Sequence, residues 1–302
     1  MTYNHLPNID QTVLAALDFF SKNSPAKFKP ESFHLPIVVG SGNAYNTAQV
    51  VFSNQAAVIA NESNFKKTLA SYQKLIKQKT IKDAIIISAS GEKDSIWETA
   101  LAKKYGLKTT LLTWTANSSA GQLADKVIVY KKLPEPYTYN VSTYLSLLLS
   151  TEKTSVAAIQ KTIAALKLPN FKKYQAFAFI LPDDFAAIAP MLEIKRDELF
   201  GPHVSLRAFS FGQARHAKFV NNFDKELVIS LGKNQYFGLA KNRWEIKLPK
   251  QVSAGLIMTL TYNLVGKIQA GQKPYYKNNI AEFCLQGPKA YGQKKPFSII
   301  VE

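Results

Sequence analysis

At residues 84–94 the chain reads Ala84-Ile-Ile-Ile-Ser-Ala-Ser-Gly-Glu-Lys-Asp94, the most informative stretch of this sequence. Its β-branched run at 85–87 predicts a buried strand that stops at a Ser/Gly loop. A helical pattern follows at once, because apolar residues recur on one stripe from Ile96 to Leu101. A strand, a Ser/Gly loop and a helix start direct hydroxyls and backbone N–H groups at one point, where the helix dipole adds positive potential. This geometry suits a phosphate group, although a polar turn with an N-cap serine explains the same four loop residues.

Similar strand–loop units stand on both sides of this stretch. Upstream, residues 37–39 predict a buried strand, and Gly40-Ser-Gly-Asn43 predicts a tight loop before a helix over 44–51. This loop is not the dinucleotide-binding fingerprint, because the third glycine is absent. Downstream, strands are predicted over 107–113 and 125–129, with a polar loop at 115–119. These loops follow the carboxyl ends of strands, where open α/β sheets bind ligands.

In this order and spacing the motifs resemble the sugar isomerase (SIS) domain family. The resemblance covers roughly residues 34–150 and rests on Gly40-Ser-Gly-Asn-Ala-Tyr-Asn46, Ser88-Ala-Ser-Gly-Glu92, Asn117-Ser-Ser-Ala-Gly-Gln-Leu-Ala-Asp125, and Pro134-Glu135 before a helix over 142–150. The C-terminal half resembles the second domain of double-SIS proteins, such as the phosphoglucose/phosphomannose isomerases and the isomerase half of glucosamine-6-phosphate synthase. The segment Lys295-Pro-Phe-Ser-Ile-Ile-Val-Glu302 is similar to the closing segment of that synthase. The resemblance implies an α/β fold of two SIS-type units, each a parallel sheet flanked by helices.

Two domains are expected on this basis. Residues 1–166 form an N-terminal SIS domain with a leading amphipathic helix over 9–23 and a linking helix over 152–166. Residues 167–302 form a divergent C-terminal SIS domain with a C-terminal tail. In this second domain, apolar runs predict strands over 176–181, 204–209 and 227–231 and a long helix over 253–269.

The composition fits this architecture and points to a compartment. The chain has 302 residues, of which 46% are hydrophobic, enough for two modest cores. Its single cysteine, Cys284, excludes an intramolecular disulfide and fits a reducing environment. The N-terminal residues lack the order of a signal peptide, and no apolar run approaches the length of a membrane-spanning helix. We therefore expect a cytoplasmic protein without membrane contact.

The charge raises the question of nucleic acid. Thirty-eight Lys and Arg stand against 21 Asp and Glu, a formal net charge of +17, and this favours an anionic partner. The basic residues are scattered as singles and pairs, and the sequence carries no zinc-finger or RNA-binding signature. A solvated lysine-rich surface that helps to capture sugar phosphates explains the charge more simply, so nucleic acid is not the expected partner. The alternative hypothesis from a different functional class is a basic protein that associates with nucleic acid.

The resemblance implies aldose–ketose isomerisation through an enediol. In this family a carboxylate removes the proton next to the carbonyl, and a histidine from the second subunit of a dimer opens the sugar ring. The matching positions here are Glu198 as the base and His216 as the ring-opening group, with Glu193 as a competing base. A base of this kind needs a pKa raised toward neutrality. A glutamate on a charged helix end is also typical of a solvated surface group, and His216 beside Arg215 is also typical of a partly exposed polar residue.

The resemblance also implies where the phosphorylated sugar binds. The second loop supplies Ser88, Ser90 and Lys93 to the phosphate, and the first loop supplies Ser41 and Asn43 to the sugar or phosphate. Three positions depart from the family pattern. They are Lys93, where a threonine is usual, Phe297, where the synthase has a catalytic lysine, and Pro182-Asp183-Asp184, where a glycine-rich turn is usual. Because two carboxylates repel an anion, the loop at 182–184 is not expected to hold phosphate.

The sequence therefore predicts a phosphosugar aldose–ketose isomerase of the hexose-phosphate type that works as a homodimer. No cofactor is implied, and four histidines and one cysteine show no metal-ligand spacing, so no metal is expected. The alternative is a sensor or regulator that binds a sugar phosphate in the same pocket without catalysing a reaction.

Overall fold

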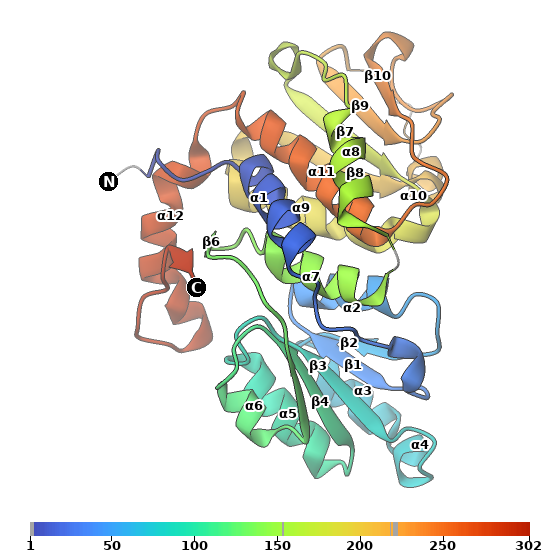
Figure 1. Ribbon diagram of the computed structural model, residues 1–302, viewed down its shortest axis with the longest axis vertical. Helices are drawn as coiled ribbons and strands as arrows, with labels where there is room; N and C mark the ends of the chain where they lie inside the picture. Colours follow the sequence, from blue (N-terminus) through green and yellow to red (C-terminus); the bar gives the residue numbers. More distant parts are fainter. Residues whose placement is uncertain (1–2, 153, 218, 220–222) are drawn as a thin grey trace. The chain divides into compact units, whose positions relative to one another are not determined.

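The computed structural model describes residues 3–152, 154–217, 219 and 223–302 (Figure 1). The chain forms two compact units. Unit 1 contains Met1–Asn23, Leu133–Leu145 and Lys153–Glu302, and unit 2 contains Ser24–Lys132 and Ser146–Glu152. The two units interleave along the chain. A division into two sequence domains at residue 166 stays a prediction.

Unit 2 is built on a five-stranded parallel sheet in the order β2-β1-β3-β4-β5. The strands are β1 Ile37–Gly40, β2 Val58–Ala60, β3 Asp83–Ile87, β4 Lys108–Thr113 and β5 Lys126–Val129. Residues 84–87 of β3 are all buried, which explains their uninterrupted apolar run, since a parallel sheet carries helices on both faces. Gly40 pairs with Ile87, so β1 and β3 end side by side.

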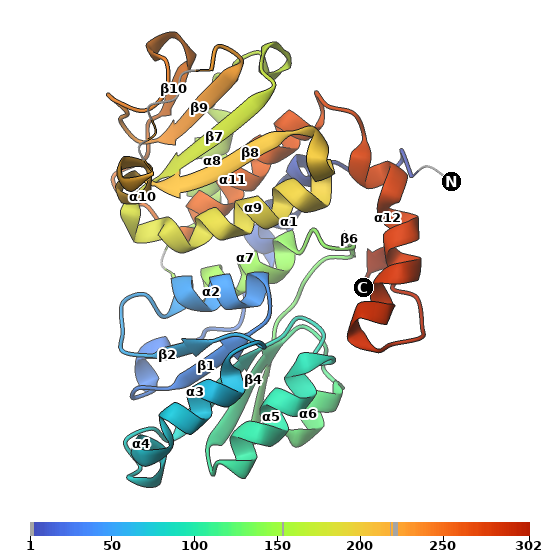
Figure 2. The ribbon, with the colours of Figure 1, turned by 180° about the vertical axis from the view of Figure 1, so that it is seen from behind.

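Helices cover the sheet of unit 2. They are α2 Asn43–Val51, α3 Phe65–Ser71, α4 Gln73–Lys77, α5 Asp94–Lys104 and α6 Ser119–Leu123, with a 3₁₀ turn at Pro30–Ser32. Figure 2 shows α3 and α5 in front of the sheet. Their buried side chains, such as Phe65 and Leu69, form one cluster with alternate strand residues, such as Ile37, Val39 and Ile86, as a period of two requires. Helix α7 Val141–Thr151 begins in unit 1 and ends in unit 2.

Unit 1 contains a four-stranded parallel sheet in the order β10-β9-β7-β8. The strands are β7 Ala176–Leu181, β8 Ser205–Ser210, β9 Glu226–Leu231 and β10 Arg243–Ile246. A separate antiparallel pair joins β6 Glu135–Pro136 to β11 Ile300–Val301. The expectation of two α/β units with parallel sheets is confirmed.

The helices of unit 1 are α1 Ile9–Lys22, α8 Val156–Ala164, α9 Ala189–Phe200, α10 Phe211–His216, α11 Ala254–Gln269 and α12 Tyr275–Gln286, with 3₁₀ turns at Phe171–Lys173, Asp183–Ile188, Gly201–His203, Ala240–Asn242 and Gly287–Tyr291. Helices α1, α8 and α9 pack against α11. Helix α11 is buried on nearly every side, which explains its apolar character all round. A Cβ on Gly266 would lie 2.2 Å from the backbone nitrogen of Asp10, so α1 approaches α11 at a position where only glycine fits. Among the described residues, no helix is long and apolar enough to cross a membrane.

Candidate active site

Five residues expected to bind the substrate lie at one edge of unit 2. Ser41 and Asn43 follow β1, and Ser88, Ser90 and Lys93 follow β3. Because these neighbouring parallel strands end at paired residues, their loops share the carboxyl edge of the sheet. The structure therefore brings together the two loops that the sequence singled out.

Both serines of the second loop hold their own backbone in place. The Oγ of Ser88 accepts a hydrogen bond from the N–H of Gly91 at 3.1 Å, and the Oγ of Ser90 accepts one from the N–H of Glu92 at 3.2 Å. A hydroxyl that accepts such a bond still carries a proton to donate. Gly91 has a φ of +64°, and a Cβ there would lie 2.1 Å from the Oγ of Ser118, so this tight turn requires glycine.

The charges around this loop are mixed. Lys93 precedes α5, and burial lowers its pKa while Asp94 opposes that shift. Asp94 stands in the first turn of α5, where its carboxylate accepts a hydrogen bond from the indole of Trp97 at 3.1 Å. Glu92 accepts a hydrogen bond from the N–H of Ser119 at 2.8 Å. The loop thus offers hydroxyls and one lysine to an anion, while two carboxylates flank that lysine.

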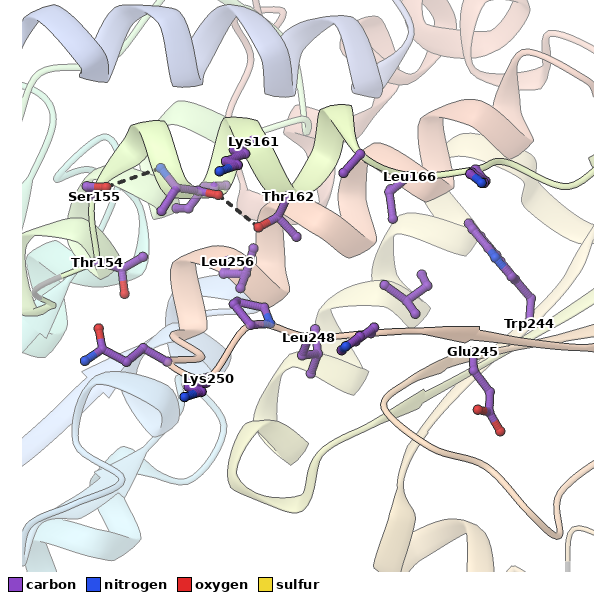
Figure 3. Close-up of a pocket in the computed structure, with 18 residues that line it drawn as sticks. Thr154, Ser155, Lys161, Thr162, Leu166, Trp244, Glu245, Leu248, Lys250 and Leu256 are labelled. Carbon is purple, nitrogen blue, oxygen red and sulfur yellow. Dashed lines mark hydrogen bonds between the residues drawn. The ribbon is translucent and has the colours of Figure 1, made fainter.

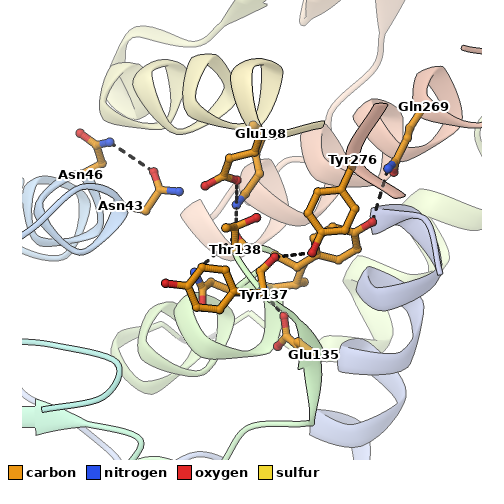
Figure 4. A network of polar contacts seen from close by, with 12 residues as sticks. Asn43, Asn46, Glu135, Tyr137, Thr138, Glu198, Gln269 and Tyr276 are labelled. Carbon is orange, nitrogen blue, oxygen red and sulfur yellow. Dashed lines mark hydrogen bonds and ion pairs between the residues drawn. The ribbon is translucent and has the colours of Figure 1, made fainter. Parts of the chain in front are cut away.

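The first loop places an amide inside the fold. Asn43 is only 7% exposed, and its Oδ1 accepts a hydrogen bond from the Nδ2 of Asn46 at 3.4 Å (Figure 4). Ser41 is half-buried just before it. Gly42 between them has a φ of +55°, which turns the chain from β1 into α2.

In unit 1, Glu198 and Lys195 form an ion pair on α9. The Nζ of Lys195 donates to the Oε2 of Glu198 at 2.6 Å and also donates to the carbonyl of Thr138 (Figure 4). The Lys195 side chain has no exposed surface, whereas the Glu198 side chain is 23% exposed. The Lys195 ammonium also lies 5.7 Å from the centre of the Tyr262 ring. A buried ammonium with these partners fixes the position of the carboxylate.

Glu198 borders a cavity of about 300 Å³. Its lining includes Thr138 and, from α12, Tyr275, Tyr276, Asn279 and Phe283. Burial raises the pKa of Glu198 above its usual range, and the Lys195 ammonium opposes that shift. Glu198 is therefore a carboxyl group that faces a cavity and holds its proton more strongly than an exposed glutamate does.

Thr138 contributes a strained backbone to this cavity. Its φ is +73°, a value that β-branched residues rarely adopt. In this conformation the Thr138 carbonyl accepts a hydrogen bond from Lys195. Neither Thr138 nor Lys195 was identified from the sequence, although the i, i+3 spacing of Lys195 and Glu198 was a usable signal.

The structure does not bring His216 to Glu198 within one chain. Glu198 lies near the end of α9, just before β8 begins, and α10, which carries His216, starts where β8 ends. The two residues therefore belong to opposite ends of this strand. His216 is exposed at the last position of α10. Glu193 is half-buried on α9 and does not line the cavity beside Glu198.

Asp183 and Phe297, two of the positions that depart from the family pattern, each contact another part of unit 1. The Oδ1 of Asp183 accepts a hydrogen bond from the N–H of Gly212 at 2.7 Å, and hydrogen bonds from Ser210 and Gly212 lower the pKa of Asp183. Phe297 stacks on Tyr137 with ring centres 5.0 Å apart.

Glu135, the other buried carboxylate near this region, caps a helix. Its two oxygens accept hydrogen bonds from the N–H groups of Val141 and Ser142 at 2.5 and 2.6 Å (Figure 4). These donors are the first N–H groups of α7, which lack partners inside the helix. The role of the Glu135 carboxylate is therefore to cap the N-terminus of α7. Across the described residues, no group of three His, Cys, Asp or Glu side chains is arranged to hold a metal ion.

Comparisons with known proteins bear on the fold. No protein-family model matches the sequence, and no curated protein matches it. The structure is similar to glucosamine-6-phosphate deaminase from Thermotoga maritima, with 15% identity and a TM-score of 0.57 over 87% of this chain and 92% of that chain. Tagatose-6-phosphate ketose/aldose isomerase from Escherichia coli gives 12% identity and a TM-score of 0.54 over 89% and 90% of the two chains.

A third solved structure agrees. The C-terminal domain of glucosamine-fructose-6-phosphate aminotransferase from Francisella tularensis has 14% identity and a TM-score of 0.51 over 87% of this chain and 92% of that chain. The chain has the SIS-type fold. Its two parallel sheets are the cores of two SIS units, as the sequence motifs predicted. At these identities the likeness establishes the SIS fold and not the reaction.

Proposed function

We propose that the protein is a phosphosugar aldose–ketose isomerase of the hexose-phosphate type. The observation that carries the proposal is Glu198, a cavity-facing carboxylate with a raised pKa that a fully buried lysine holds in place. The names of the similar solved structures support the substrate class, since they include a tagatose-6-phosphate ketose/aldose isomerase and a glucosamine-6-phosphate deaminase.

In this proposal Glu198 moves the proton. Its carboxylate takes the proton from the carbon next to the substrate carbonyl, and an enediolate forms. A hydroxyl proton then passes between the two substrate oxygens, and the same carboxyl group, after exchange of its proton with solvent, protonates the neighbouring carbon. A carboxyl group with a raised pKa suits this task, because a base works best when its pKa lies near the working pH. Lys195 keeps the carboxylate in one orientation and opposes an excessive rise of its pKa.

Ring opening and phosphate binding are assigned to other parts of the chain. Ser88, Ser90 and Lys93 bind the phosphate, and Ser41 and Asn43 contact the sugar or phosphate. Their shared position at the edge of the sheet in unit 2 supports this assignment. His216 of a second copy in a homodimer opens the ring. The cytoplasmic location and the homodimer stay predictions.

Deuterium incorporation tests the isomerase directly. The purified protein is incubated in D₂O with a panel of hexose and pentose phosphates and with the matching free sugars, and the products are followed by NMR. We expect one phosphosugar to be converted with deuterium at the carbon next to the carbonyl, and the free sugars to stay unchanged. A protein that converts none of these phosphosugars is not an isomerase of this class.

A sugar-phosphate sensor is the second candidate, and Phe297 favours it. The aromatic stack of Phe297 on Tyr137 leaves this tail position without a charged group. A sensor binds a phosphosugar and is stabilised by it, but catalyses no exchange of deuterium. Ligand-induced stabilisation in the same panel therefore separates a sensor from a protein that does not bind sugars, since a ligand that binds only the folded state raises the melting temperature.

A further inference from the structure

The two sheets share a strand order but differ in strand number. In unit 2 the order is β2-β1-β3-β4-β5, and in unit 1 the corresponding strands β8-β7-β9-β10 repeat its first four positions. In unit 2 the strand at the fourth position, β4, pairs with β5 along residues 110–113. In unit 1 the chain passes from the end of β10 at Ile246 to α11 at Ala254 without forming a fifth strand. Among the residues that the structure describes, no strand pairs with the outer edge of β10.

The backbone of β10 offers hydrogen-bonding groups at that edge. The carbonyl of Ile246 accepts a hydrogen bond from the N–H of Gly232, so Ile246 is turned toward β9. Because successive residues of a strand direct their N–H and C=O groups to opposite sides, Glu245 directs its own away from β9. An open strand edge of this kind is a template for another extended chain.

A groove of about 1040 Å³ runs along this edge, between α8 and the segment 244–251 (Figure 3). Every residue from Trp244 to Gln251 lines it. Residues 244–246 of this lining belong to β10 and 247–251 continue toward α11. Since successive side chains of a strand point to opposite faces, lining by all of 244–246 places the groove beside the edge of β10 at its carboxyl end. Its walls include the buried side chains of Ile159, Ile246 and Leu256.

The rim of the groove is positively charged. Lys161, Lys167, Lys247 and Lys250 all line it and are exposed, and in the described part of the chain none of them forms an ion pair. The one acidic side chain at the rim, Glu245, already accepts a hydrogen bond from the N–H of Asn234 at 2.8 Å. The groove thus combines an apolar floor with unpaired cations.

We propose that this groove binds an extended acidic peptide segment of another protein, which pairs with β10 as the fifth strand of the sheet. The open strand edge supplies main-chain hydrogen bonds, the floor accepts alternate apolar side chains, and the lysines attract carboxylates. A second copy of this chain is a poorer occupant, because each copy carries a formal charge of +17. A nucleic acid would use the lysines but not the strand edge.

Peptide binding tests the proposal. The probe is a fluorescent peptide of about eight residues that alternates valine and glutamate, long enough to run along the groove. Binding is measured by anisotropy at about 150 mM salt, where exposed charges are largely screened beyond a Debye length. Two matched peptides serve as controls: one has lysine in place of glutamate, and the other has N-methyl groups that block strand pairing. We expect the acidic peptide alone to bind, and the amide hydrogen of Glu245 to exchange more slowly in its presence.

Charge reversal then locates the site. The double variant Lys247→Glu, Lys250→Glu should weaken peptide binding by at least about tenfold, because both rim charges then repel the ligand. The matched control is Lys74→Glu, Lys77→Glu, which changes the net charge equally at two exposed lysines of α4 in unit 2. Equal binding by the two double variants, or equal binding of the N-methylated peptide, overturns the proposal. So does an oligonucleotide that binds as tightly as the peptide, or a dimer that the Lys247 and Lys250 changes dissociate.

Discussion

The Lys195 ammonium donates a hydrogen bond of 2.6 Å to the Glu198 carboxylate, one turn further along α9. The lysine is fully buried, while the glutamate keeps part of its surface open to a cavity. Burial and the ammonium act on the pKa of Glu198 in opposite directions, and burial has the larger effect. The proton affinity of Glu198 is therefore set by a balance that a single substitution at Lys195 can change.

Replacing the base tests the proposed mechanism. Glu198→Gln keeps the shape of the side chain and removes its ability to accept a proton, so isomerisation should fall by about 10²–10⁴-fold while phosphosugar binding persists. Turnover and binding are measured on the same preparation. Glu193→Gln is the matched control on the same helix and should be mild. If Glu193 proves essential and Glu198 dispensable, the assignment of the base is wrong.

Changing the partner of the base should shift the pH profile. In Lys195→Gln the ammonium that lowers the pKa of Glu198 is gone, so that pKa rises further. Because the ionised carboxylate is the active form, the acidic limb of kcat/KM should move to higher pH by roughly one unit or more. Arg196→Gln removes a neighbouring cation that pairs with Asp197 at 2.8 Å and should leave the limb in place. An unmoved limb in Lys195→Gln would show that this lysine does not tune the base.

The phosphate loop can be tested apart from catalysis. Ser90→Ala removes a hydroxyl that accepts one loop hydrogen bond, so the unliganded protein should lose only about 0.5–1.5 kcal/mol. Phosphosugar binding should weaken markedly, and the stabilisation of roughly 2.7 kcal/mol expected at a hundredfold ligand excess should shrink. Thermal melts with and without ligand measure both effects. Equal stabilisation of the wild type by a free sugar and by its phosphate would remove the phosphate assignment.

A buried carboxyl group in unit 2 predicts a pH-dependent stability. Glu98 is 1% exposed, its Oε1 has no hydrogen-bond partner among the described residues, and burial raises its pKa to about 8, with Asp94 and Glu62 adding to the shift. Between about pH 4.5 and 8 the folded protein therefore binds more protons at this site than the unfolded chain does. The free energy of unfolding should fall as the pH rises through this window, by at most about 1.4 kcal/mol per pH unit.

Urea unfolding of two variants measures this linkage. In Glu98→Gln the decline between pH 4.5 and 8 should be reduced relative to the wild type, because the titrating group is absent. Glu31→Gln, at an exposed glutamate, should keep the wild-type slope. Parallel curves for the wild type and Glu98→Gln would mean that Glu98 does not titrate in this range.

Mixing two inactive variants tests whether the site is shared between subunits. If Glu198 of one chain works with His216 of another, co-refolded Glu198→Gln and His216→Ala chains should regain about a quarter of the wild-type activity, since half of the dimers are mixed and one of their two sites is intact. Co-refolding each variant with itself is the control. Activity that stays at the control level, together with efficient mixing, argues against a shared site.

Much of the fold was predictable because its strands are buried on both faces. Continuous apolar runs such as 176–181 identify a parallel strand at once, and β7 occupies that range. Strands β2 and β10 were not predicted. The first has only three residues, and the second mixes Arg243, Trp244 and Glu245 because it lies at a sheet edge. Helix α12 was also missed, since its apolar stripe is narrow and polar residues surround it.

Only part of the candidate site could be predicted from the sequence, for a related reason. The serine and glycine loops are recognisable from their local turn residues, and they lie where the motif order placed them. The surroundings of Glu198 depend on residues that are distant in the sequence. Thr138 reaches Lys195 from before α7, and the cavity wall comes from α12. Contacts of this kind leave no periodic trace in the chain.

The Asp183 carboxylate accepts a hydrogen bond from the N–H of Gly212 at the carboxyl edge of the sheet in unit 1. Unit 1 repeats the strand–loop–helix plan of unit 2, yet at its carboxyl edge the chain supplies its own anion. A free anion at this edge would have to displace the tethered Asp183 carboxylate to reach the N–H of Gly212. We therefore expect a titration with a phosphosugar to count one bound anion for each chain.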